Sequence, residues 1–146
     1  MGTQSNVTFT TTCLELSLRA TPSSVREARV AVGDTVAELV SDKRVVDDVR
    51  LCVSEAVTNV VRHAYGTKRG DLQVVVERED HQLVVVVRDE GMGVTASRRR
   101  KPGGFGLKII EKVAVRHTIE SAPSTGTEVR MSFPLGAQAF AGSIDR

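Results

Sequence analysis

Aromatic side chains are scarce in this chain of 146 residues: they make up 3% of the sequence, and tryptophan is absent. The hydrophobic core must therefore be built from valine, leucine, isoleucine and alanine. Proteins that bind single-stranded nucleic acids stack bases on aromatic rings, so we do not expect this function. A net charge of +2 is also too small to indicate a nucleic-acid or membrane partner.

Cysteine is scarce too, with only Cys13 and Cys52 in the chain. Both have apolar neighbours, which favours buried, reduced thiols over a disulfide. No CxxC motif or Cys/His cluster occurs, so a zinc site is not expected. No apolar run approaches the roughly 20 residues of a membrane span, and the N-terminus has no signal-peptide pattern. We therefore expect a cytoplasmic protein with no membrane partner.

What the sequence does contain is a regular hydrophobic pattern, which predicts one domain over residues 12–135. A flexible N-terminus (1–11) and a flexible C-terminal tail (136–146) are expected to flank it. Helical spacing of apolar residues predicts three helices, and short alternating or valine-rich runs predict five strands. The helices are expected at 21–40, 42–65 and 105–115, and the strands at 13–20, 71–80, 82–90, 117–122 and 127–133.

Local signals place the ends of these elements. Ser23 or Ser24 can cap the first helix, and Ser41 or Asp42 can cap the second. A polar turn at residues 80–81 predicts a hairpin. The resulting order, β-α-α-β-β-loop-α-β-β, predicts an α+β two-layer sandwich with a mixed or antiparallel sheet covered on one face by helices. The repeated βαβ units of a parallel Rossmann sheet are missing.

The second predicted helix carries a polar stripe in "SEAVTNVVRHAY" (54–65), formed by Glu55, Asn59 and His63 at intervals of four residues. On an α-helix such residues share one face. The Asn59 carboxamide oxygen suits Mg²⁺, which needs few protein ligands when phosphate oxygens complete its shell. Glu55 could act as a general base. A solvated helix face is the alternative, and for His63 a structural hydrogen bond is favoured.

Two glycine clusters are further candidates. In "RDEGMG" (88–93), Asp89 could accept a hydrogen bond from an amine while a planar ring lies over Gly91 and Gly93. A polar turn that closes the strand is the alternative, and no helix opens after Gly93 as a dinucleotide-binding fingerprint would require. In "GGFGLKII" (103–110) the glycines open a helix whose free N–H groups suit a phosphate; a flexible loop is the alternative.

The combination of motifs is more specific than any one of them. "SEAVTNVVRHAY", "VRDEGMGV", "GGFGLKIIEKVA" and "STGTEVRMSF" occur in this order over residues 13–135. Together they resemble the GHKL (histidine-kinase-like) ATPase superfamily, and within it the bacterial anti-sigma factor serine-protein kinases. The resemblance implies a Bergerat-type sandwich that binds ATP and Mg²⁺.

The resemblance also implies roles for individual residues. Asn59 would hold Mg²⁺, Glu55 would act as the base, and Asp89 would accept from the adenine amine with Thr127 beside it. The remaining nucleotide-binding positions would shape the pocket and its lid: Gly91, Gly93, Gly104, Gly106 and Leu107. The segment between the glycine clusters is short for the superfamily, and its basic residues 98–101 are either a lid over the triphosphate or a solvated loop.

The function implied by the resemblance is an ATP-dependent serine/threonine kinase that is also an anti-sigma factor. It would phosphorylate a STAS-type anti-anti-sigma protein and sequester a sigma factor, with a homodimer as one expected form. The alternative is a non-catalytic module that uses nucleotide only as a switch on a partner. A histidine kinase fragment is less favoured, because no dimerisation helices with a phosphoacceptor histidine precede the domain.

Overall fold

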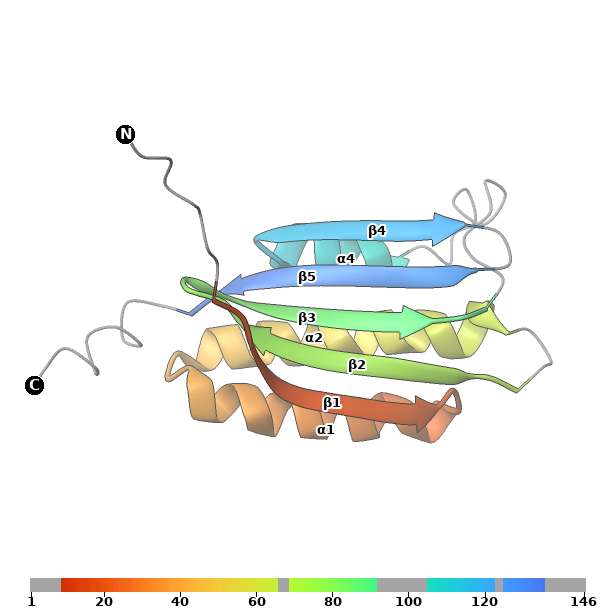
Figure 1. Ribbon diagram of the computed structural model, residues 1–146, viewed down its shortest axis with the longest axis horizontal. Coiled ribbons are helices and arrows are strands. Elements are labelled where there is room, and N and C mark those ends of the chain that lie inside the picture. Colours follow the sequence, from red (N-terminus) through yellow and green to blue (C-terminus); the bar gives the residue numbers. More distant parts are fainter. Residues whose placement is uncertain (1–8, 66–68, 92–104, 123–124, 136–146) are drawn as a thin grey trace, which may run out of the picture.

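A computed structural model describes residues 9–65, 69–91, 105–122 and 125–135 (Figure 1). The predicted order of helices and strands is confirmed, with one short π-helix, η1, added after the second helix. The elements are β1 (Thr11–Arg19), α1 (Pro22–Leu39), α2 (Lys43–Asn59), η1 (Val60–Ala64), β2 (Asp71–Arg78), β3 (Gln82–Asp89), α4 (Phe105–Val113), β4 (Arg116–Ala122) and β5 (Gly126–Pro134).

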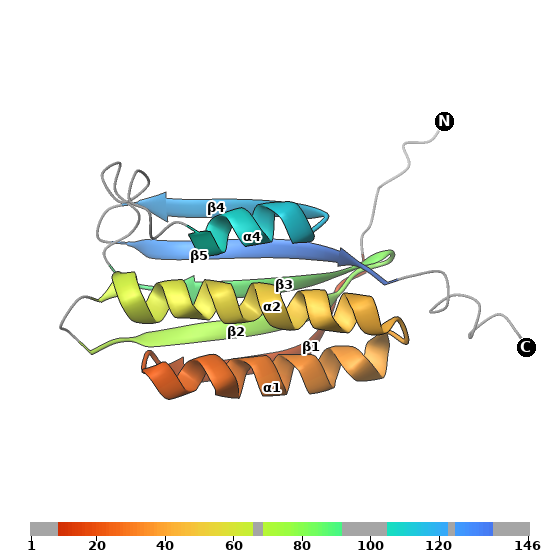
Figure 2. The ribbon, with the colours of Figure 1, turned by 180° about the vertical axis from the view of Figure 1, so that it is seen from behind.

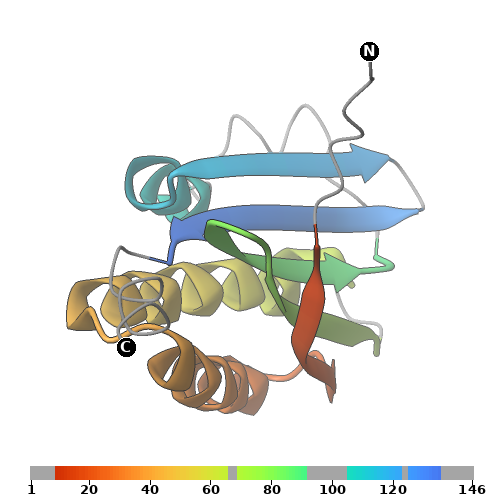
Figure 3. The ribbon, with the colours of Figure 1, turned by 60° about the vertical axis from the view of Figure 1, so that its left-hand side comes forward.

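The strands form one antiparallel sheet in the order β1-β2-β3-β5-β4. The predicted α+β sandwich is thereby confirmed, and the sheet is antiparallel rather than mixed. The helices lie side by side on one face of the sheet, with α2 between α1 and α4 (Figures 2 and 3). The opposite face carries no described helix. None of the described helices is both long and apolar enough to cross a membrane.

The core lies between the sheet and the helices and is made mainly of valine, as the scarcity of aromatics predicts. Alternate residues of β2, β3 and β5 point to the helices and are buried, since successive side chains of a strand face opposite sides. The apolar residues of α1 and α2 that recur at helical spacing are mostly buried, although Val25 and Leu39 of α1, and Val61 in η1, are only half-buried. The largest fully buried side chains are Phe133, Leu83, Ile110, Met131 and Leu135.

Three valines are also buried on the face away from the helices: Val75, Val84 and Val86. Long charged side chains from neighbouring strands surround them. Arg130 on β5 reaches past β3 to Glu77 on β2, with an Nη2–Oε1 distance of 3.3 Å. Because the stems of such residues are apolar, they can cover valine while their charged ends stay in water. The continuous valine run of β3 is explained by burial on both of its faces.

The helix starts differ in part from the sequence-based prediction. The N-cap of α1 is Thr21, so the predicted Ser23 or Ser24 cap is wrong. Ser24 instead lies in the first turn, where its hydroxyl accepts from the Thr21 N–H at 3.3 Å and donates to the Thr21 carbonyl at 2.6 Å. The N-cap of α2 is Asp42, one of the two predicted residues, which accepts from the Arg44 N–H at 2.9 Å.

Candidate functional site

Asp89 is the last residue of β3 and lies opposite Thr127 of β5 in the strand register. Its side chain is buried, with 8% of the residue exposed. One carboxylate oxygen, Oδ1, accepts from the Gly91 N–H at 2.8 Å. Burial raises the pKa of Asp89, while hydrogen bonds from the backbone of Gly91 and Thr127 lower it in part. A carboxylate offers about four acceptor sites, so these two donors leave capacity for a ligand.

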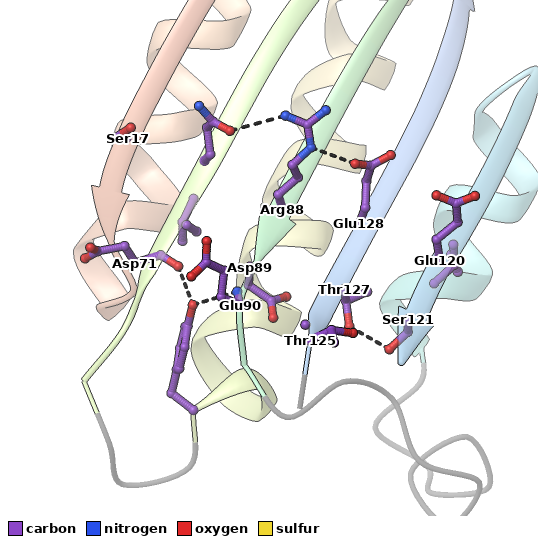
Figure 4. A pocket seen from close by; sticks show the side chains of 15 residues that line it. Ser17, Asp71, Arg88, Asp89, Glu90, Glu120, Ser121, Thr125, Thr127 and Glu128 are labelled. Atoms are coloured by element: carbon purple, nitrogen blue, oxygen red, sulfur yellow. Dashed lines mark hydrogen bonds and ion pairs between the residues drawn. The ribbon is translucent and has the colours of Figure 1, made fainter. Parts of the chain in front are cut away.

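The Thr127 hydroxyl has a partner that sequence inspection missed. Its Oγ1 lies 3.0 Å from Oγ of Ser121, which stands opposite it on β4. The two hydroxyls share one hydrogen bond beside Asp89 (Figure 4). No local signal marks Ser121, because its position depends on how β4 and β5 pair.

Two positions at this end of the sheet require glycine, because neighbouring backbone atoms occupy the space that a side chain would need. A Cβ added to Gly91 would overlap the carbonyl group of Ala64, the last residue of η1. One added to Gly126 would overlap the carbonyl oxygen of Asp89, and Gly126 also has a φ of +96°, which favours glycine. The predicted reason for Gly91 was space for a ligand ring, whereas its described neighbour is the protein itself.

Glu55 and Asn59 lie one turn apart on α2, as the predicted polar stripe requires. Arg50 of the same helix reaches α1, where it lies over Gly33 and its Nη2 is 4.0 Å from Asp34. Asn59 follows Arg50 by nine residues, which is about two and a half turns. Asn59 therefore lies on the flank of α2 opposite Arg50. The helix next to α2 on the side away from α1 is α4 (Figure 2).

The amide nitrogen of Asn59, Nδ2, is buried and has no hydrogen-bond partner among the described residues. An unsatisfied buried donor costs about 1–3 kcal/mol. In native proteins such a group usually has a hydrogen-bond partner outside the protein, such as a water or a ligand. Within the described ranges, no group of three His, Cys, Asp or Glu side chains could hold a metal. Mg²⁺ in nucleotide sites nevertheless needs few protein ligands, because waters and phosphate oxygens complete its shell, and a carboxamide oxygen is a suitable hard ligand. The free Nδ2 suits an acceptor such as a phosphate oxygen, while Oδ1 is the amide atom that can bind a metal. Asn59 therefore fits a nucleotide phosphate and a Mg²⁺ bound with it.

The third member of the stripe, His63, is not on the same α-helix. The helix changes to the wider π form at Val60, so the straight stripe predicted from α-helical spacing holds only from Glu55 to Asn59. His63 is half-buried and has an interaction partner. π-Turns occur often at functional sites, and this one brings Ala64 against Gly91.

A hollow of about 1080 Å³ opens at the ends of the strands near Asp89 (Figure 4). It extends over the helix-free face, where Arg88 is held between Glu128 (Nε–Oε1 2.6 Å) and Gln73 (Nη1–Oε1 3.3 Å). Asp89 and Thr127 line it, whereas Glu55 and Asn59 do not. The turn after Asp89 nevertheless contacts the end of η1, where Gly91 packs on Ala64, and α2 itself packs on β3 and β5.

The remaining predicted positions belong to the second glycine cluster and the segment before it. Gly93, Gly104 and the basic residues 98–101 lie outside the described residues. Gly106 and Leu107 are in the first turn of α4, which packs beside α2. The predicted helix start at this cluster is confirmed, while the roles of these residues stay predictions.

Comparison with known proteins gives three consistent results. Residues 18–133 match the model of the histidine kinase-like ATPase domain. The anti-sigma F factor of Clostridium acetobutylicum is 31% identical over 129 residues, which are 81% of this chain and 90% of that protein. The anti-sigma F factor of Bacillus subtilis is 30% identical over 131 residues, 82% of this chain and 90% of that protein.

The third comparison, with solved structures, concerns the fold alone. The histidine kinase domain of the blue-light activated histidine kinase of Erythrobacter litoralis EL346 superposes with a TM-score of 0.50 at 23% identity. The match covers 70% of this chain but only 50% of that one. The likeness agrees with the Bergerat-type sandwich. Since the family model spans nearly the whole described domain and the four motifs occur in their expected order, the chain belongs to the histidine kinase-like ATPase family.

Proposed function

We propose that this protein is an ATP-dependent anti-sigma factor and serine/threonine kinase. It would sequester a sigma factor and phosphorylate a STAS-type anti-anti-sigma protein, so that the two partners exchange according to phosphorylation. The observation that carries the proposal is the 31% identity to an anti-sigma F factor across 81% of the chain. The buried Asp89 and the unpartnered amide of Asn59 support nucleotide binding at the same end of the fold.

Asp89 and Thr127 would recognise the base. A carboxylate accepts from the 6-amino group of adenine, whereas guanine presents a carbonyl oxygen there and is repelled. Their register across β3 and β5 keeps both side chains at one end of the sheet. ATP is therefore the nucleotide that this pair favours.

Asn59 and Glu55 lie on the side of α2 away from α1, and they would act on the phosphate groups of the nucleotide. The Asn59 amide would hold Mg²⁺, which when bound neutralises charge on the phosphate oxygens. Glu55 would take the proton from the hydroxyl of the partner's serine or threonine. Gly106 and Leu107 stand at the start of α4, where free N–H groups suit a phosphate, and Gly93 and Gly104 would border the nucleotide.

The alternative is a module that binds nucleotide and a regulatory partner without transferring phosphate. One measurement separates the two functions: transfer of label from γ-labelled ATP to a purified STAS protein from the same organism. We expect labelled STAS protein with wild type and none with Glu55→Gln. If the unlabelled STAS protein is recovered in a nucleotide-dependent complex with the wild-type chain, the switch function replaces the kinase function.

The anti-sigma part of the proposal needs its own test. The purified chain with Mg·ATP should form a complex with a sigma factor of its organism in size-exclusion chromatography, and added STAS protein should release it. The mass of the free chain in the same experiment tests the expected homodimer. No direct contact with nucleic acid is expected, so DNA should not alter the elution of the free chain.

A further inference from the structure

Tyr65, the only tyrosine of the chain, follows η1 directly and has no role in the proposed function. Its ring lies against Gly70, where an added Cβ would overlap the ring carbons Cδ1, Cε1 and Cζ. Glycine at position 70 thus allows the ring to pack directly on the backbone before β2. The ring is held in place by this contact and by its attachment to the end of η1.

The hydroxyl of Tyr65 connects the first residue of β2 with the residue that follows β3. It donates to the Asp71 carbonyl at 2.6 Å and accepts from the Glu90 N–H at 2.9 Å. The dashed lines at Asp71 and Glu90 in Figure 4 mark these two bonds. Burial, and then the nearby carboxylates, raise the pKa of Tyr65, partly offset by the Glu90 N–H. The hydroxyl therefore keeps the proton that it donates.

The second bond matters because Glu90 lies between Asp89 and Gly91. Asp89 is bound to the Gly91 N–H, and Gly91 packs on Ala64, the neighbour of Tyr65. The turn that carries Asp89 is therefore attached to the end of η1 at two adjacent points, one by packing and one by a hydrogen bond. The packing contact involves backbone atoms, so a side-chain substitution cannot remove it selectively. The hydrogen bond depends on a single side-chain atom, the Tyr65 hydroxyl oxygen.

We propose that Tyr65 is a positioning residue for nucleotide specificity: its hydroxyl fixes the turn of residues 89–91 so that the Asp89 carboxylate can distinguish adenine from guanine. The inference rests on the proposed role of Asp89 in base recognition. Tyr65 is not assigned any contact with the nucleotide. A hydrogen bond that discriminates between bases depends steeply on distance and angle, so loosening the turn should weaken discrimination more than overall binding.

The test is Tyr65→Phe, which keeps the ring on Gly70 and removes both hydrogen bonds. The net free energy of one hydrogen bond corresponds to roughly a two- to tenfold change in an equilibrium constant. We expect the ratio of ATP to GTP affinity to fall by about that factor in calorimetry with Mg²⁺. Affinity for Mg·tripolyphosphate, which has no base, should stay unchanged. Equal losses for ATP, GTP and tripolyphosphate would show a merely structural role and overturn the inference.

A matched control is Thr35→Val on α1, which also removes a hydroxyl bonded to a backbone carbonyl, that of Ala31 at 3.0 Å. It should leave the ATP to GTP ratio unchanged; a ratio lowered as much as in Tyr65→Phe would contradict the inference. A second measurement needs no variant: the Glu90 amide of the wild-type chain should be protected from hydrogen exchange. Exchange at the rate of a free amide would mean that the hydroxyl bond is absent.

Failure of this inference can be distinguished from failure of the proposed function. If wild type prefers ATP and Asp89→Asn removes the preference while Tyr65→Phe retains it in full, only the role of Tyr65 is refuted. If wild type shows no preference, or Asp89→Asn keeps it, base recognition by Asp89 is wrong and the positioning role is refuted with it.

Discussion

At the scale of single residues, Asn59 and Asp89 are polar groups whose burial is a cost to the folded chain. The Asn59 amide nitrogen lacks a partner among the described residues, and burial disfavours the charged form of Asp89. Groups of this kind persist in proteins where a ligand uses them, since substitutions that remove them would otherwise stabilise the fold. Each can be tested by separating stability from binding.

Replacing Asn59 by alanine should weaken Mg·ATP without weakening the fold. The loss of an interaction with a charged group is worth about 1.5–3 kcal/mol, so affinity should fall by about tenfold or more in calorimetry. The free energy of unfolding should stay equal or rise, because an unsatisfied buried donor is removed. Thr58→Ala, the preceding residue on another face of α2, is the control. Unchanged affinity in a folded Asn59→Ala protein would contradict the assignment.

Asp89 should make stability depend on pH in a defined direction. Its pKa is raised in the folded state, so the ionised carboxylate destabilises the fold at neutral pH, and this cost disappears as pH falls below the ordinary aspartate pKa of about 3.9. Asp89→Asn should therefore be more stable than wild type at pH 7 in urea unfolding, with a difference that shrinks in acid. Asp80→Asn, which replaces an exposed carboxylate in the β2–β3 turn, is the control.

The same Asp89 variant should lose base selectivity. Wild type should bind ATP at least about tenfold more tightly than GTP, since an unpaired polar group costs about 1–3 kcal/mol. A stabilised Asp89→Asn protein with a reduced preference for ATP would show that the site sacrifices stability for recognition. Equal binding of both nucleotides by wild type would refute the role.

Glu55→Gln should separate binding from chemistry. The side chain keeps its size on α2, but a carboxamide cannot take the serine proton. Loss of a general base lowers the rate by about 10²–10⁴-fold, while Mg·ATP affinity should remain. Transfer from labelled ATP to a STAS protein measures the rate, with the exposed Glu38→Gln on α1 as the control. An undiminished rate would assign the base to another residue.

At the scale of elements, the site depends on where strands and helices end. The change from α2 to the π-helix η1 at Val60 sets the position of Ala64, which packs against the turn after β3. The start of β5 at Gly126 also packs against this turn, at Asp89 and Glu90. Both contacts are between backbone segments, so a small displacement of either segment should also displace Asp89.

Gly126→Ala should therefore damage both stability and binding. The residue has φ +96° and its added Cβ would overlap the carbonyl of Asp89. A left-handed conformation costs a non-glycine residue about 1–2 kcal/mol, and overpacking typically costs about 1–3 kcal/mol more. We expect a loss of at least about 2 kcal/mol in the free energy of unfolding. Ser17→Ala, exposed on β1, is a control that should change it little; a fully stable Gly126→Ala would contradict the strand-end geometry.

At the scale of the whole molecule, a sheet covered by helices on one face leaves the other face to charged side chains and three buried valines. Nucleotide binding should stabilise this fold as a unit. Ligand at 100 times its dissociation constant adds about 2.7 kcal/mol, which for a domain of this size corresponds to about 5–10 °C in melting temperature. Mg·GTP at the same concentration should give a smaller shift and Asn59→Ala almost none. A melting temperature independent of Mg·ATP would refute nucleotide binding.

The sequence by itself determined the order of elements, the two-layer class and the core composition. Hydrophobic spacing and the Asp42 cap are local signals, and local signals suffice to define helices, strands and one hairpin. The motif order also sufficed to identify the family that the comparisons confirm. The places of Glu55 and Asn59 on the second helix and of Asp89 near the end of its strand were predictable for the same reason, whereas the change to a π-helix after Asn59 was not.

Only the tertiary structure decided which of these ends meet. The place of β5 between β3 and β4 brings Ser121 to Thr127, and the π-turn brings Ala64 to Gly91. The Tyr65 hydroxyl reaches Glu90, 25 positions later in the chain. The Ala64–Gly91 and Tyr65–Glu90 contacts join segments that are distant in sequence, and each depends on helix and strand packing that no single stretch encodes. A local pattern can name a candidate residue, but its neighbours are set by the packing of the whole chain.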